Sequence, residues 1–93
     1  MVTPEDIKGW IEENLEGARV EITGDGHHFE AEIICDGFEG KNRIQQHQMV
    51  YGALGDRMKA QIHALSMRTL TTKEKNAQQG VFVGLLKQGI TTR

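Results

Sequence analysis

Two segments of alternating apolar and polar residues meet at Gly24-Asp25-Gly26, and this arrangement constrains the fold more than any other feature of the sequence. Residues 18–23 alternate before the glycines and residues 29–33 alternate after them, with the two-residue period of half-buried strands. The glycines supply the backbone conformations that a tight reversal needs. The sequence therefore predicts a β-hairpin with one face in a core.

A helix is predicted on the N-terminal side of the hairpin. Thr3 is a suitable N-cap and Pro4 a suitable first helical residue. We expect this helix to stop at Gly17. The apolar residues before that point recur on one face, namely Ile7, Trp10, Ile11 and Leu15.

A second helix is predicted on the C-terminal side of the hairpin, over residues 41–59. Its inward face is expected to carry a stripe at spacings of three and four residues, namely Ile44, His47, Tyr51, Leu54 and Met58. Alternation returns over residues 62–68 as a third strand. Thr71 and Glu74 then form a capping box for a short helix toward Gly80.

These elements give the order α-β-β-α-β(-α), an α+β domain whose three-stranded mixed sheet has helices on one face. Residues 1–80 form this single domain, and residues 81–93 are a C-terminal tail without a structural assignment. The longest apolar stretch, residues 81–86, is far shorter than the roughly 18 residues of a membrane span. We therefore expect no membrane association.

Charge and cysteine content narrow the functional classes. The 11 basic and 13 acidic residues give a net charge of −2, so the chain has no general attraction for nucleic acid. The single cysteine, Cys35, excludes an internal disulfide and favours a cytoplasmic protein. At a strand end it is expected to be a small apolar core residue. Because no nucleophile stands beside a base and no carboxylate pair marks a pocket, no enzyme is predicted.

The expected strand order brings histidines together. If the strands at 29–33 and 62–68 are neighbours, the helical crossover makes them parallel, so that both begin at one edge of the sheet. His27 and His28 then approach His63. Imidazoles on strands about 4.8 Å apart can bind one metal ion.

Several short motifs resemble the BolA family in their order and spacing. They are Phe38-Glu-Gly40, the helical Gln46-His-Gln-Met-Val-Tyr51, and Ile62-His-Ala-Leu65. The turn sequence Gly-Asp-Gly-His-His-Phe is similar to the IbaG-like branch, and the helical motif is similar to the mitochondrial BolA-like branch. The resemblance covers residues 19–74 and implies a fold similar to a class II KH domain.

The resemblance also implies a function. Members of the family pair with monothiol glutaredoxins of the Cys-Gly-Phe-Ser type and share a bridging [2Fe-2S] cluster with the glutaredoxin and glutathione. The histidine of the Ile-His-Ala motif, here His63, would bind one iron together with a residue of the hairpin loop. Because two ligands leave most of the cluster's shell unfilled, we expect the isolated chain to bind no cluster tightly. We also expect the isolated chain to be a monomer or a weak homodimer.

The second iron ligand is open between three residues of the loop. The resemblance ranks His28 first, because the IbaG-like loop has its histidine directly before the phenylalanine. Strand alternation favours His27, which is predicted to share a face with His63. Asp25 is a candidate because it stands where several relatives carry cysteine. It ranks third because a carboxylate is a poorer ligand for an iron–sulfur site.

The alternative function is a KH-like nucleic-acid-binding regulator of transcription, for which we expect only weak binding. The basic residues on or near the second helix would then contact phosphates, namely Lys41, Arg43, Arg57 and Lys59. The segment from Gly52 to Gly55 matches the Gly-x-x-Gly clamp of KH domains, but it falls inside the predicted helix and is interpreted as a chance match. His47 is expected to be a core histidine bonded to a polar neighbour. Lys75 stands where relatives often carry Trp, which predicts a less firmly docked last helix.

Overall fold

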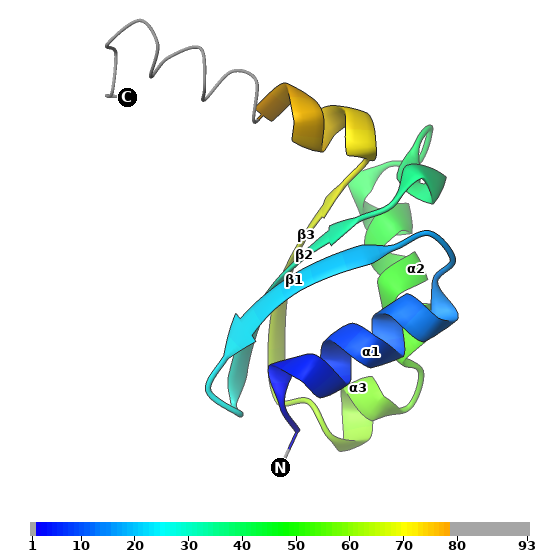
Figure 1. Ribbon diagram of the computed structural model, residues 1–93. Helices are drawn as coiled ribbons and strands as arrows, with labels where there is room; N and C mark the ends of the chain where they lie inside the picture. Colours follow the sequence, from blue (N-terminus) through cyan, green and yellow to red (C-terminus); the bar gives the residue numbers. More distant parts are fainter. Residues whose placement is uncertain (1, 79–93) are drawn as a thin grey trace, which may run out of the picture.

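The computed structural model describes residues 2–78, which form an α+β domain around a three-stranded sheet (Figure 1). The elements are α1 (Pro4–Asn14), β1 (Arg19–Gly24), β2 (His28–Ile34), the 3-10 helix η1 (Asp36–Phe38), α2 (Arg43–Leu54), α3 (Arg57–Ala60) and β3 (Ala64–Leu70). Residues 72–78 are helical. The predicted order is confirmed, while Gly80 and the tail at 81–93 lie outside the described residues.

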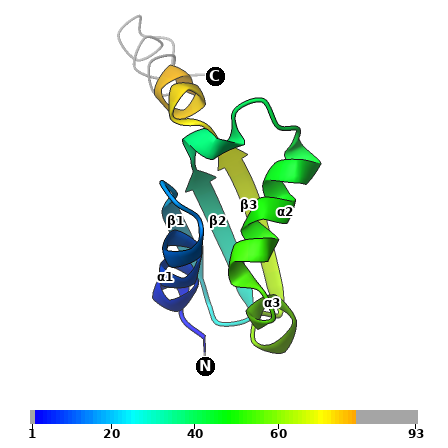
Figure 2. The same cartoon turned by 90° about the vertical axis from the view of Figure 1, so that its right-hand side faces the viewer.

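The sheet is mixed, as the sequence predicts, with the strand order β1-β2-β3. β1 and β2 form the antiparallel hairpin, and Val20 lies opposite Ile33. β2 and β3 are parallel, and His28 lies opposite Ala64. α1 and α2 both pack on the same face of the sheet (Figures 1 and 2). The crossover from β2 to β3 therefore places the starts of these two strands side by side.

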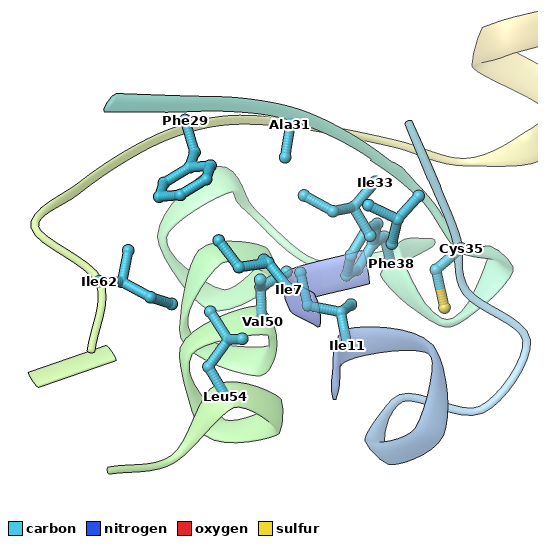
Figure 3. Packing of buried hydrophobic residues seen from close by; sticks show 11 residues of the cluster. Ile7, Ile11, Phe29, Ala31, Ile33, Cys35, Phe38, Val50, Leu54 and Ile62 are labelled. Atoms are coloured by element: carbon cyan, nitrogen blue, oxygen red, sulfur yellow. The ribbon is translucent and has the colours of Figure 1, made fainter. Parts of the chain in front are cut away.

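The core fills the space between the two helices and the sheet (Figure 3). Its large members come from α1, the inward positions of the sheet, η1 and α2, namely Ile7, Ile11, Val20, Phe29, Ile33, Phe38, Val50 and Leu54. Burying a side chain of this size contributes roughly 1.5–3 kcal/mol. The alternation predicted for the hairpin is thus confirmed by burial.

The start of α1 is fixed by a capping box. The Thr3 hydroxyl accepts from the N–H of Asp6, and the Asp6 carboxylate accepts from the N–H of Thr3. Pro4 occupies the first turn. The helix ends at Asn14, earlier than predicted, and Gly17 adopts a φ of 79° in the turn toward β1.

The prediction of one helix over residues 41–59 is wrong in extent and in its inward face. α2 ends where Gly55 adopts a φ of 60° and a ψ of −139°, and α3 follows as a separate helix. Val50 and Leu54 are buried, whereas Ile44 and Tyr51 are 70% and 41% exposed. Because α2 carries no charged residue after Arg43, its polar face was not marked in the sequence. The stripe through Ile44 and Tyr51 therefore looked as apolar as the buried one.

Gln46 connects three parts of the fold. Its Nε2 donates to the carbonyl oxygens of Phe38 and Lys41, at 3.1 and 2.9 Å. Its Oε1 accepts a 2.6 Å hydrogen bond from the hydroxyl of Thr69. The amide therefore links η1, the start of α2 and β3. A side chain with only a donor or only an acceptor could not make all three bonds.

The helix at residues 72–78 begins with the predicted capping box, in which Thr71 and Glu74 exchange hydrogen bonds. Lys75 then donates to Glu32 of β2 at 2.6 Å, and both side chains are about one-fifth exposed. This ion pair ties the helix to the sheet. The expected loss of anchorage at Lys75 is therefore not observed.

Side chains of α1 form hydrogen bonds with the main-chain groups of Val20 at the outer edge of β1. The ammonium of Lys8 donates to the carbonyl oxygen of Val20 at 2.8 Å and to the carboxylate of Glu12 at 2.9 Å. Glu12 in turn accepts the N–H of Val20 at 3.0 Å. The hydrogen bond from Lys8, followed by that from Val20, lowers the pKa of Glu12.

No helix among residues 2–78 is long and apolar enough to cross a membrane.

Candidate functional site

The hairpin turn and the segment that leads into β3 lie at the same end of the sheet (Figures 1 and 2). His27 belongs to the turn, and His63 directly precedes β3. Their ring centroids are 5.5 Å apart, and the ring planes are inclined by 34°. The prediction that parallel pairing of these strands brings histidines together is confirmed for this pair.

His28 takes a different position. It is the first residue of β2, directly before the buried Phe29, and lies opposite Ala64. Because side chains alternate along a strand, His28 projects to the face opposite Phe29, on which α1 and α2 do not pack. The structure thus joins His27 to His63 and places His28 on the other side of the sheet.

Asp25 shapes the turn that carries both histidines. One of its carboxylate oxygens accepts the backbone N–H groups of His27 and His28, each at 2.9 Å. These bonds, that from His28 first, lower the pKa of the Asp25 carboxyl. Gly26, which lies between Asp25 and His27, adopts a φ of 99°. Asp25 therefore fixes the backbone of the loop through one of its two oxygens.

Gly24 is required by close packing at the end of β1. A Cβ atom there would lie 2.7 Å from the carbonyl oxygen of His28 and would overlap the ring of Phe29. The absence of a side chain lets the hairpin close tightly over Phe29, which is fully buried. Packing therefore helps to position the turn that carries His27.

The histidine pair is accessible and incomplete as a metal site. His27 and His63 are both exposed. Within residues 2–78, no three His, Cys, Asp or Glu side chains converge closely enough to hold a metal ion. By themselves, the two imidazoles could supply only part of a ligand set.

Cys35 and His47 do not take part in this arrangement. Cys35 follows the far end of β2, is buried, and donates from its Sγ to the carbonyl oxygen of Glu16 at 3.5 Å. Its predicted role as a small core residue is confirmed. His47 is partly buried on α2, and its Nε2 has no hydrogen-bond partner among the described residues. The predicted hydrogen bond of His47 is therefore wrong for this nitrogen.

The four basic residues predicted for nucleic acid do not form one patch. Lys41 and Arg43 lie at the start of α2, and Arg57 and Lys59 lie on α3. The 12 residues of α2 separate the two pairs by about 18 Å. Arg57 also stacks over the ring of Trp10, with its Cζ 4.8 Å from the centroid. Sequence reading missed this cation–π contact, which no local pattern could reveal.

The fold and the site together define a class: a small α+β domain in which parallel strand pairing sets an exposed histidine pair at one end of the sheet. Residues 11–74 match the family model described as "BolA-like protein". The chain belongs to the BolA-like family. The resemblance deduced from the motifs is thereby confirmed.

Individual relatives agree in sequence and in fold. The chain is 35% identical over 79 residues to "Protein BOLA2" of Arabidopsis thaliana, covering 81% of this chain and 84% of that protein. It is 33% identical over 60 residues to "DNA-binding transcriptional regulator BolA" of Escherichia coli, covering 63% and 57%. A solved bolA homologue from Coxiella burnetii has a TM-score of 0.78 and 51% identity, covering 82% of this chain and 99% of that one. None of these names states an enzymatic activity.

Proposed function

We propose that this chain is the partner of a monothiol glutaredoxin of the Cys-Gly-Phe-Ser type, and that the two proteins share a bridging [2Fe-2S] cluster in iron–sulfur trafficking or iron homeostasis. The observation that carries the proposal is the contact between His27 and His63 in a chain of the BolA-like family. The cytoplasm is the proposed compartment.

The donor set fits such a cluster. Two imidazoles with centroids 5.5 Å apart are close enough for a nitrogen of each to reach one iron, and both are open to a docking protein. Imidazole ligation of one iron raises the reduction potential relative to thiolate ligation. The thiolates of glutaredoxin and glutathione would hold the other iron. We therefore propose His63 and His27 as the ligands from this chain.

Each neighbouring residue has a role in this proposal. Asp25 holds the loop through the N–H groups of His27 and His28, which makes it a positioning residue. His28, on the other face of the sheet, is the natural comparison residue, since it shares the turn and the exposure of His27. The ranking of loop residues becomes His27, then His28, then Asp25.

The test is anaerobic reconstitution of this chain with a Cys-Gly-Phe-Ser glutaredoxin, glutathione, iron and sulfide. We expect a coloured heterodimer whose visible circular dichroism differs from that of the glutaredoxin homodimer. His63→Ala should abolish the difference while the far-ultraviolet spectrum of the isolated chain stays unchanged. Identical visible spectra at every mixing ratio would refute the proposal.

A nucleic-acid-binding regulator is the second candidate, supported by the name of the Escherichia coli relative. The division of the basic residues between the two ends of α2 limits the number of adjacent phosphate contacts. Binding would then be weak and would fall steeply with salt. Sequence-selective DNA binding at physiological salt, lost in Arg43→Glu or Lys59→Glu, would favour this candidate instead.

A further inference from the structure

The two outer edges of the sheet differ in the hydrogen bonding of their main-chain groups. At the β1 edge, both main-chain groups of Val20 are bonded by Lys8 and Glu12 of α1. Among residues 2–78, β3 is the other outer strand, because it pairs there with β2 alone. Within residues 2–78, no side chain or turn is hydrogen-bonded to the outer main-chain groups of residues 64–69. This edge is therefore a row of free donors and acceptors, the usual template for an added strand.

A groove runs along this free edge. It has a volume of about 440 Å³ and is lined by residues 67–70 of β3, by the first turns of α2 and by the helix at 72–78. Thr69 of this segment is hydrogen-bonded to Gln46, so the groove lies where β3 meets the first turns of α2. Figure 2 shows α2 running beside β3 on this side.

The charges of the groove favour an acidic occupant. Arg43 and Arg68 both line it, and neither forms an ion pair with a described residue. Glu74 also lines it, but one of its carboxylate oxygens already accepts the N–H of Thr71. The buried Nε2 of His47, on the α2 wall, adds a polar group without a partner in the described chain.

We propose that the outer edge of β3 binds an extended acidic peptide segment of another protein as a fourth strand of the sheet. Main-chain hydrogen bonds to residues 67–70 would supply the pairing. Arg43, on the side of α2, and Arg68, which alternates with Thr69 and so projects to the other face, would bind carboxylates on the two faces of the peptide. The groove length of four residues, about 13 Å, accommodates a strand of four or five residues.

Other occupants fit the groove less well. A second copy added antiparallel along β3 and centred on Met67 would place the two Arg68 side chains diagonally across the new strand pair on one face, without an acidic side chain on β3 to compensate them. Single-stranded nucleic acid is bound by stacking on aromatic rings, and among the described residues that line the groove the only aromatic ring is the His47 imidazole. The free main chain of β3 is matched best by another main chain.

The test uses the fluorescein-labelled peptide acetyl-Thr-Val-Glu-Glu-Glu-Val-Thr-amide, whose adjacent glutamates project to both faces of an added strand, and fluorescence anisotropy. We expect saturable binding, with nuclear magnetic resonance shifts and slowed amide exchange at residues 67–70. Arg43→Glu combined with Arg68→Glu should weaken binding at least about tenfold. Arg19→Glu, a single charge reversal of the same kind at an exposed position of β1, should leave binding unchanged.

Two peptide controls leave the protein untouched. Peptides N-methylated at alternate amides block one edge of the added strand, so one of the two methylation patterns should abolish binding. A peptide with Lys in place of Glu should bind at least about tenfold more weakly.

The proposal is overturned by several outcomes. These are no binding at millimolar peptide, equal binding of both methylated peptides with displacement by inorganic phosphate, binding of oligouridylate at the same residues but not of the peptide, or a β3-mediated homodimer in solution. Because His63 precedes β3 while the groove lies at its far end, His63→Ala should not affect peptide binding. Failure of this proposal is thus distinguishable from failure of the glutaredoxin proposal.

Discussion

One carboxylate oxygen of Asp25 accepts the backbone N–H of His27 at 2.9 Å, so an acidic side chain fixes the loop on which the histidine pair depends. Asp25→Ala should release the turn and separate the rings of His27 and His63. The measurement is the nuclear Overhauser contact between the two imidazoles, which should disappear while the core signals of Phe29 persist. Asp25→Asn should retain part of the contact, because an amide oxygen still accepts both N–H groups. An unchanged contact in Asp25→Ala would show that strand pairing alone positions the histidines.

The iron ligand from the loop can be identified by comparing neighbouring substitutions. In the reduced heterodimer with glutaredoxin, His27→Ala should remove one imidazole nitrogen from the hyperfine coupling seen by electron paramagnetic resonance. His28→Ala should leave that coupling unchanged, because His28 projects to the opposite face of the sheet. If His28→Ala alone alters the spectrum, the loop rearranges when the partner binds.

Gly24→Ala should destabilise the domain by about 1–3 kcal/mol, because its methyl group would overlap the Phe29 ring and approach the carbonyl oxygen of His28. Gly52→Ala is the matched control within α2, where an added Cβ meets nothing within 4 Å. It should stabilise the domain by about 0.5–1 kcal/mol through its higher helix propensity. Urea unfolding of both variants measures these changes. Equal effects of the two substitutions would argue against the close packing at Gly24.

Glu12→Gln should reduce the decrease in the free energy of unfolding as the pH falls. The folded-state pKa of Glu12 is lowered from an ordinary value near 4.5, so its contribution is fully present above that value and is lost as pH falls through the folded pKa. The contribution of this partly exposed group is about 1 kcal/mol. Unfolding free energies measured from pH 6 to pH 3 should fall more steeply for the natural chain than for Glu12→Gln. Parallel curves would contradict this assignment.

The hairpin and the parallel strand pair could be predicted because their signals are local. Alternation across Gly24-Asp25-Gly26 fixes the turn, and the helical crossover fixes the direction of β3, which together imply the contact of His27 with His63. Strand parity also distinguished His27 from His28. The family resemblance favoured His28 because it directly precedes Phe29, and that position in the sequence does not say on which face of the sheet the side chain lies.

The inward face of α2 could not be predicted for the opposite reason. Without charges after Arg43, two apolar stripes compete, and only the packing of Val50 and Leu54 against the sheet selects between them. The roles of Gln46 and Lys75 likewise depend on partners distant in sequence, Thr69 and Glu32. Such bonds leave no periodic signal in the chain.

The bonds from Lys8 and Glu12 to Val20 have a consequence for assembly. A filament of stacked sheets requires every copy to present two open edges, one to accept the preceding molecule and one to template the next. Here Lys8 and Glu12 of α1 occupy the main-chain groups of Val20 on one of them, which hinders strand addition at that edge. Bonds of this kind disfavour repeated edge-to-edge addition and so favour a domain that accepts a strand at one edge only.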